Sequence, residues 1–214
     1  MRTYLYGLIL ARNAHLVPPH IAGIHGATLS VLPCDALSAL VSEVESASSR
    51  DLDALRAHDH AVQAVVHHGT TATAVRFGQT FSDATELRQH LAGRASTLAA
   101  ILEELDGCVE MRLLMTVPPE HPAQQPDVAP GRAYLEKLRG SPRTTGLALQ
   151  PALGDVVRAE RVEELPNGAG VSFAHLIRRE HEQTYRDAVA SQPSLSAAKL
   201  VGPLALYAFA EGVP

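Results

Sequence analysis

Tryptophan is absent from this chain of 214 residues, and phenylalanine and tyrosine together account for only 4% of it. Leucine, valine, isoleucine and alanine must therefore supply most of the core, which suits helices packed on sheets. The composition is otherwise ordinary, with 46% hydrophobic and 19% charged residues. Such a balance is typical of a folded globular protein and excludes disorder as the default state.

Long apolar runs and an excess of basic residues are also missing. No stretch approaches the roughly 18 apolar residues that a membrane helix needs, and the start of the chain lacks the basic and apolar segments of a secretory signal. The formal net charge is −5, whereas nucleic-acid affinity comes mostly from lysine and arginine. We therefore expect a cytoplasmic protein that has neither a membrane nor a nucleic acid as its partner.

Catalytic and nucleotide-binding motifs do not occur. The sequence has no G-x-x-x-x-G-K-S/T loop, no G-x-S-x-G elbow and no H-E-x-x-H helix. Cys34 and Cys108 lie far apart in apolar surroundings, so we expect reduced core residues. Among the eleven histidines, His58 and His60 are two positions apart and point to different sides of a helix. We expect no catalytic residue, no metal, no cofactor and no enzymatic activity.

Apolar periodicity predicts a mixture of strands and helices before residue 118. Strands are expected at 2–10, 27–33, 37–44, 73–81 and 108–117. Helices are expected at 51–68, with apolar positions 52, 55, 62, 65 and 66, and from Asp83 to Gly107. His58 occupies a gap in the first of these apolar stripes, where a hydrogen-bonding role is favoured over catalysis. The pattern indicates an α+β fold.

A proline-rich stretch divides the chain. Five of the thirteen residues from 118 to 130 are proline, which can continue neither a helix nor a central strand. We predict an N-terminal α+β domain over 1–117, a linker or loop over 118–130, and a C-terminal α+β domain over 131–214 that strand 108–117 helps to complete. Beyond the linker, helices are expected at 131–139, 143–160 and 179–191, and strands at 161–165, 170–177 and within 195–209.

Arg76 is a cation in an otherwise apolar or small run, Ala74-Val75-Arg76-Phe77-Gly78. Strand alternation places it opposite Val75 and Phe77. It either points to solvent or pairs with a carboxylate such as Glu110, because a buried arginine is costly without a partner. As a functional alternative it is a protein-binding anchor, since arginine is enriched at interface hot spots. Gly78 is expected to permit a bulge or a close backbone approach.

Tyr207 and Phe209 are expected on one side of a terminal strand. Core packing is the simplest role for two such aromatic residues, and an exposed sheet edge that receives a partner's strand is the alternative.

Six segments in fixed order resemble one protein family. They are Tyr4-Leu5-Tyr6-Gly7-Leu8, His58 to Val62, Arg76-Phe77-Gly78, Leu105 to Glu110, Gly131-Arg132-Ala133-Tyr134-Leu135 and Gly202 to Phe209. Together they resemble the gas vesicle proteins F and L. The chain departs from the family pattern at Thr73-Ala74, where a proline is usual, and near its end, where it lacks a tryptophan.

The resemblance implies two small α+β domains, the C-terminal one a modified ferredoxin-like fold. It also implies an accessory or minor structural protein of the gas vesicle, acting in the cytoplasm or on the vesicle. Its partners would be the hydrophobic major shell protein and other accessory vesicle proteins, which it would bind either to aid nucleation of the shell or to prevent aggregation. The family-motif or partner-contact residues would be Arg76, Phe77, Gly78, Tyr207 and Phe209. The competing hypothesis is a small-molecule-binding regulatory or enzymatic α+β domain, because one fold hosts many functions.

Overall fold

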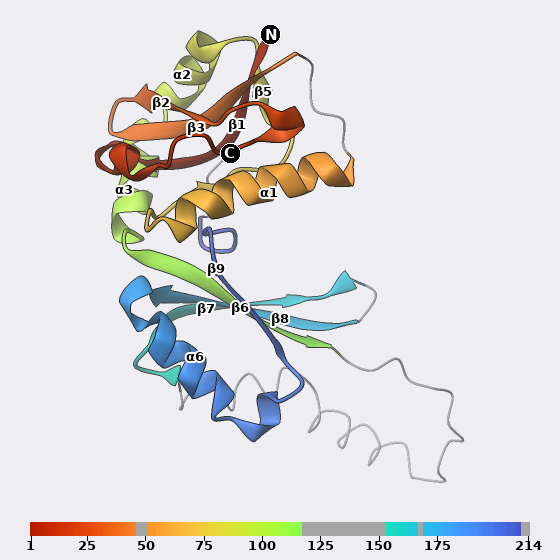
Figure 1. Ribbon diagram of the computed structural model, residues 1–214. Coiled ribbons are helices and arrows are strands. Elements are labelled where there is room, and N and C mark those ends of the chain that lie inside the picture. Colours follow the sequence, from red (N-terminus) through yellow and green to blue (C-terminus); the bar gives the residue numbers. More distant parts are fainter. Residues whose placement is uncertain (46–50, 117–152, 167–168, 211–214) are drawn as a thin grey trace, which may run out of the picture. The chain divides into compact units, whose positions relative to one another are not determined.

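The computed structural model describes residues 1–45, 51–116, 153–166 and 169–210, drawn as a coloured ribbon in Figure 1. The chain forms two compact units. The first consists of Met1–Val109 together with Pro203–Pro214, and the second of Glu110–Gly202. No helix among the described residues is long and apolar enough to cross a membrane.

An antiparallel sheet forms the centre of the first unit. Its strands are β1 (Arg2–Leu10), β2 (Ser30–Cys34), β3 (Leu37–Val44), β4 (Thr73–Ala74) and β5 (Thr80–Phe81). The order is β2-β3-β1-β4, and β5 also pairs with β1. β1 is buried from Thr3 to Leu10, which explains why it is apolar almost throughout rather than at every second position. Short 3-10 helices η1 (Ala11–Leu16) and η2 (Ile24–Gly26) connect β1 to β2.

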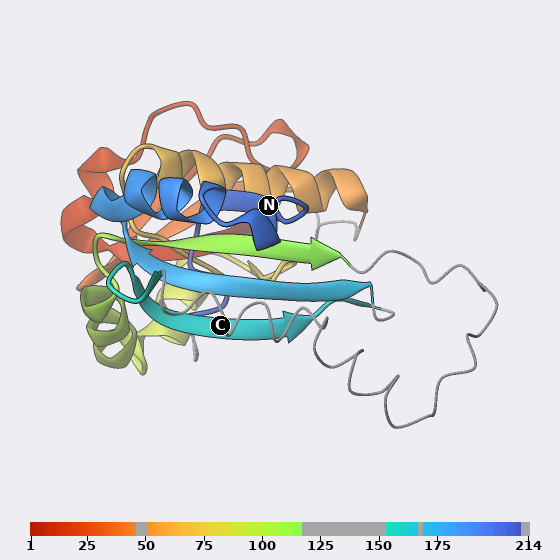
Figure 2. The same ribbon diagram turned by 90° about the horizontal axis from the view of Figure 1, so that it is seen from below.

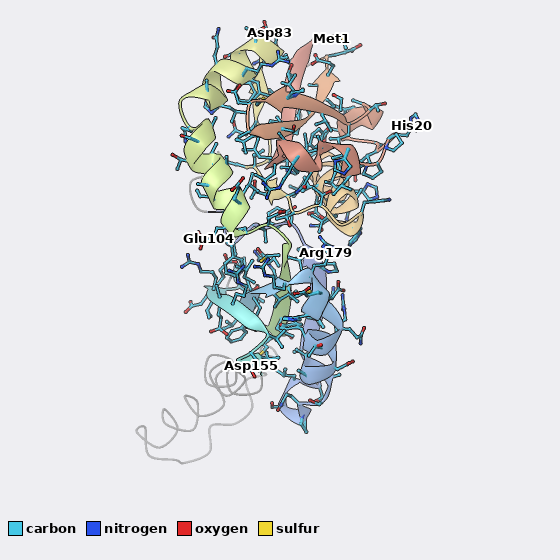
Figure 3. All side chains as sticks on the ribbon, turned by 90° about the vertical axis from the view of Figure 1, so that its left-hand side faces the viewer. Met1, His20, Asp83, Glu104, Asp155 and Arg179 are labelled. Atoms are coloured by element: carbon cyan, nitrogen blue, oxygen red, sulfur yellow. The ribbon has the colours of Figure 1, made fainter. Side chains whose placement is uncertain are left out.

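Helices cover both faces of this sheet. Helix α1 (Leu52–His67) lies on one face, and α2 (Ala84–Ala92) and α3 (Ala95–Glu104) pack on the other, where Leu87, Leu91 and Leu98 meet Leu5 and Leu8. Figure 3 shows these layers, with Asp83 and Glu104 marking the outer ends of α2 and α3. The side chains of Asp51 and Asp83 cap the starts of α1 and α2 by accepting backbone N–H groups.

The single helix predicted from Asp83 to Gly107 is wrong, because the structure breaks it at Gly93 and Arg94. Gly93 ends α2, and Arg94 has φ −125° and ψ −1°, which is not helical. Glycine is a poor residue for a helix interior. The predicted apolar stripe is therefore divided between two shorter helices, α2 and α3, and both parts face the sheet.

The second unit contains a four-stranded sheet and one described α-helix. Its strands are β6 (Cys108–Thr116), β7 (Val157–Glu164), β8 (Gly170–Arg178) and β9 (Lys199–Leu204), in the order β7-β8-β6-β9. Figure 2 shows β7, β8 and β6 side by side. Placing the first strand of the unit between its third and fourth is the ferredoxin-like order, so the predicted α+β class is confirmed.

Helix α6 (Glu182–Ala190) follows β8 through η4 (Arg179–His181), and η5 (Pro193–Leu195) precedes β9. The predicted helix 143–160 is wrong at its end, because Val157 already begins β7. The short predicted helix 131–139 and the proline-rich stretch 118–130 lie outside the described residues. The two units divide the chain within β6 and within β9. The domain boundary expected at 118–130 stays a prediction.

Candidate functional site

The segment around Arg76 leaves the sheet instead of continuing as a strand. The carbonyl of Tyr6 accepts the N–H of Val75 at 3.1 Å, and the preceding residue of β1, Leu5, donates its N–H to the carbonyl of Gln79 at 3.0 Å. Adjacent residues of β1 therefore pair with residues four positions apart. The strand predicted over 73–81 is wrong, since residues 76–78 form an excursion between β4 and β5.

Glycine makes this excursion possible. Gly78 has φ +91°, a left-handed conformation that residues with a side chain rarely adopt. Its N–H donates to the hydroxyl of Tyr4 at 2.9 Å. The expected bulge at Gly78 is thus a turn that a buried tyrosine of β1 holds in place.

Tyr4 also joins the excursion to α1. Its hydroxyl lies 3.0 Å from Nδ1 of His58. The same oxygen accepts the Gly78 N–H, so one hydroxyl connects β1, the excursion and α1. Burial lowers the pKa of His58 to about 4, although Asp59 and the Val75 backbone act in the opposite direction. Neutral His58 is therefore a hydrogen-bonding residue at physiological pH, as predicted.

Aromatic rings pack around this hydrogen bond. His58 stacks on Tyr6 with ring centroids 5.4 Å apart and meets Phe77 edge-on at 5.7 Å. The Tyr6 hydroxyl lies 2.7 Å from Oγ of Ser42 and accepts the N–H of Ile24. The motif residues of β1, α1 and the excursion therefore form one cluster.

Gly7, in the same motif, is required by close backbone approach. A Cβ at this position would lie 2.5 Å from the carbonyl oxygen of Thr73, nearer than non-bonded carbon and oxygen atoms approach each other. Any side chain here would push β4 away from β1, and with it the start of the excursion.

A groove of about 480 Å³ lies over the aromatic cluster, and we call it the α1 groove. It is lined by Leu55, Arg56, His58, Asp59, Val75, Arg76, Phe77 and Tyr207. Arg76 is exposed, and it makes no hydrogen bond or ion pair within the described part of the chain. Of the two structural roles expected for Arg76, solvent exposure and pairing with a carboxylate, the structure shows solvent exposure. The carboxylate proposed as its partner, Glu110, is instead bound by Nε of Arg112 at 2.5 Å.

Tyr207 enters the groove from the far end of the sequence. The N–H of Leu206 donates to the carbonyl of Ala72 at 3.0 Å, and Ala205 and Leu206 are buried. The Tyr207 hydroxyl donates to Oδ1 of Asp59 on α1 at 2.5 Å. Tyr207 and Phe209 do not share a strand face as predicted, because β9 ends at Leu204 and the residues after it bend.

The α1 groove brings together three of the five residues singled out by the sequence, namely Arg76, Phe77 and Tyr207. Gly78 lies beneath as the turn residue, and half-buried Phe209 is not among the lining residues. Sequence reasoning missed Leu55. Positions 52 and 55 belong to the apolar stripe of α1, yet Leu52 is 58% exposed and Leu55 is 45% exposed.

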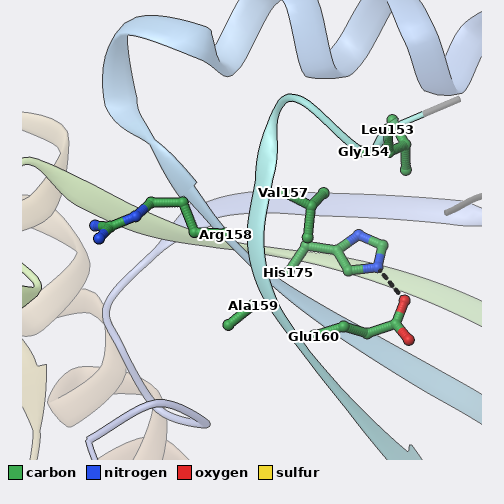
Figure 4. A pocket seen from close by; sticks show the side chains of 7 residues that line it. All are labelled: Leu153, Gly154, Val157, Arg158, Ala159, Glu160 and His175. Carbon is green, nitrogen blue, oxygen red and sulfur yellow. Dashed lines mark hydrogen bonds and ion pairs between the residues drawn. The ribbon is translucent and has the colours of Figure 1, made fainter. Parts of the chain in front are cut away.

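A second cavity, of about 300 Å³, lies in the second unit beside His175 and Glu160 (Figure 4). The two side chains point toward one another in Figure 4, with Nε2 of His175 2.9 Å from Oε2 of Glu160. The other ring nitrogen lies 2.6 Å from the hydroxyl of Tyr185 on α6. Both nitrogens of His175 are thus bonded to protein groups, which makes this trio a link between β7, β8 and α6 rather than a reactive site.

Metal-ligand geometry does not occur in the described ranges, which contain no group of three or more His, Cys, Asp or Glu side chains that could hold an ion. The two cysteines are free and buried, as predicted.

Comparison with known proteins places these features in one family. Residues 2–211 match the family described as gas vesicle synthesis protein GvpL/GvpF. Gas vesicle protein F2 of Halobacterium salinarum is 32% identical over 119 residues, a match that spans 54% of this chain and 54% of that protein. The alignment thus covers about half the length of this curated relative.

Two crystal structures share the fold. GvpF from Anabaena sp. PCC7120 superposes with a TM-score of 0.80 at 18% identity, covering 98% of this chain and 96% of the other. GvpF from Microcystis aeruginosa has a TM-score of 0.75 at 15% identity, covering 98% and 99%. With the family match extending over nearly the whole sequence, the chain belongs to the gas vesicle synthesis protein GvpL/GvpF family.

Proposed function

We propose that this protein is an accessory protein of gas vesicle assembly that binds the hydrophobic major shell protein and other vesicle proteins through the α1 groove. Family membership supports the assembly role. The observation that carries the binding proposal is the groove itself, where Arg76 stands exposed beside Phe77, Leu55 and Tyr207. Arginine and tyrosine dominate the energetics of many protein interfaces.

The physical logic of such a role is shielding. A shell subunit that assembles through apolar faces would aggregate if it were free in water, and a protein that covers those faces keeps it dispersed until it is added to the shell. The protein then works in the cytoplasm and at the growing vesicle, binds without catalysis and needs no cofactor.

Retention of vesicle proteins on the full-length chain tests this function. We expect the purified protein to retain the major shell protein or another vesicle protein, and Arg76→Ala and Tyr207→Ala to weaken retention by about tenfold or more, as interface anchors do. Arg2→Ala, at an exposed arginine outside the groove, is the matched control and should retain its partners fully. Failure of the wild-type chain to retain any vesicle protein would contradict the proposal and favour a ligand-binding function.

A further inference from the structure

Neither edge of the first sheet is suited to receive a partner's strand. At the β2 edge, Pro33 has no N–H to offer, and its carbonyl already accepts Nε of Arg88 at 3.2 Å. At the opposite edge, β4 and β5 are two residues each and are separated by the excursion at 76–78. A partner bound at this unit must therefore be recognised through side chains rather than through a continued ladder of backbone hydrogen bonds.

The outer face of α1 offers such side chains in a helical arrangement. Leu52, Leu55 and Asp59 are spaced three and four residues apart, so they form one ridge along the helix that is about 10 Å long. Both leucines are largely exposed, and Tyr207 contacts the far end of the ridge through Asp59. A second helix laid beside α1 would pack its own side chains against this ridge and against Phe77.

Charge adds a requirement on that helix. Arg56 is already paired with Asp53 at 3.3 Å, and the Asp59 carboxylate accepts the Tyr207 hydroxyl. Arg76 makes no such contact with any described residue. A partner that covered Arg76 without an acceptor would remove water from its guanidinium at a large cost, and a carboxylate is the acceptor that suits it best.

We propose that the α1 groove receives an amphipathic helix of a vesicle protein, whose apolar side chains cover Leu52, Leu55, Phe77 and Tyr207 and whose acidic side chain pairs with Arg76. The inference rests on the proposed function, because it assumes that vesicle proteins bind in this groove. It adds the form and the chemistry of the partner segment. That segment is a helix with apolar side chains at positions i, i+3 or i+4, and i+7, and with a carboxylate beside this apolar stripe.

Photo-crosslinking from α1 tests the form of the partner. Benzoylphenylalanine replaces Leu55 in the full-length chain, which is produced together with the vesicle proteins, and the crosslinked peptide is sequenced. Leu16 is the matched control position, with 40% of its surface exposed against 45% for Leu55, and it is not among the lining residues of the groove. We expect a crosslink from position 55 to a segment with helical apolar spacing and an acidic residue, and none from position 16.

Charge reversal tests the chemistry. Arg76→Glu should weaken binding by about tenfold or more, and replacing the partner's acidic residue with lysine should restore binding to Arg76→Glu alone. Leu55→Asp should have a similar effect, with Leu16→Asp as its control. Circular dichroism of each variant confirms that the substitution leaves the fold intact.

Crosslinks from position 55 to a vesicle-protein segment with two-residue alternation would overturn the inference while leaving the proposed function standing. Full retention of vesicle proteins by Leu55→Asp and Arg76→Glu, or crosslinks only to a second copy of this chain, would overturn both the inference and the α1 groove as the binding surface. Loss of retention by the wild-type chain would be different, since it would overturn the proposed function itself.

Discussion

At the scale of single residues, His58 makes the first unit sensitive to acid. Burial holds the pKa of His58 in the folded state at about 4, below the ordinary histidine pKa of 6.5, so the unfolded chain takes up the proton first as the pH falls. The free energy of unfolding is then unaffected by His58 above pH 6.5 and decreases between pH 6.5 and 4, by about 3 kcal/mol for a shift of this size. His175 acts in the same direction, because burial lowers its pKa too.

We expect His58→Gln to flatten this pH dependence. Urea unfolding measured at intervals from pH 7 to pH 4 should give a smaller decrease for the variant than for the wild type. His60→Gln, at an exposed position of the same helix, is the control and should keep the wild-type slope. An equal slope in the wild type and in His58→Gln would show that His58 is not the titrating group.

Gly78 and Gly93 offer a matched pair of glycines. A Cβ would meet nothing within 4 Å at either position, but Gly78 has φ +91° and Gly93 has φ −67°. Gly78→Ala should lower the free energy of unfolding by about 1 kcal/mol through backbone strain alone. Gly93→Ala should be neutral or stabilising by less than about 1 kcal/mol. Equal effects in denaturant unfolding would contradict the strained turn at the excursion.

At the scale of secondary-structure elements, α6 depends on a buried polar link to its sheet. Tyr185→Phe should lower the free energy of unfolding by about 1–3 kcal/mol, because Nδ1 of His175 loses its hydrogen bond. His175 is only 1% exposed, so water cannot replace the lost partner. The same change at Tyr207 removes a hydroxyl near solvent and should cost less than about 1 kcal/mol. Guanidinium unfolding of both variants measures the difference, and a smaller cost at Tyr185 would contradict the link.

Elements with a strong repeat were predictable from the sequence. The expected strand 2–10 is β1, the strand 37–44 is β3, and the helix expected at 51–68 begins and ends within one residue of α1. These segments combine a clear periodicity with capping or turn residues at both ends. Those signals are weak in 143–160, where a helix was expected. The end of that segment is instead a strand, because β7 begins at Val157.

The excursion and the groove could not be predicted for a different reason. An apolar run from Thr73 to Phe81 has the composition of a strand, and only the pairing of Leu5 and Tyr6 with Gln79 and Val75 shows that residues 76–78 are expelled. Likewise, Leu55 fits an apolar stripe that faces the sheet, yet it lies at the exposed edge of that stripe. Both features depend on neighbours that are distant in the sequence, whereas Arg76, Phe77 and Tyr207 could be named from family motifs.

At the scale of the whole molecule, the first unit is completed by residues that follow the second unit in the sequence. Ending the chain after Leu204 would remove buried Ala205 and Leu206 and the bond from Tyr207 to Asp59. We expect this truncation to destabilise the first unit by several kcal/mol, given roughly 1.5–3 kcal/mol for a buried leucine alone. Hydrogen exchange should then be faster in α1 and β4 than in the full-length protein.

The control for the truncation is a chain with Tyr207→Ala, which keeps the buried backbone and loses only the side chain. It should show wild-type exchange in β4 and faster exchange only near Asp59. If truncation accelerated exchange in β7 and β8 but not in α1, the assignment of residues 203–214 to the first unit would be contradicted.

This interrupted order of segments bears on synthesis at the ribosome. Residues 1–109 emerge early, but one wall of the α1 groove is Tyr207, which is made after all of the second unit. A nascent chain therefore cannot present the finished groove while the second unit is still being translated. If the proposed function holds, a nascent chain that ends before Tyr207 lacks this wall of the groove and should bind vesicle proteins more weakly than a chain that includes it.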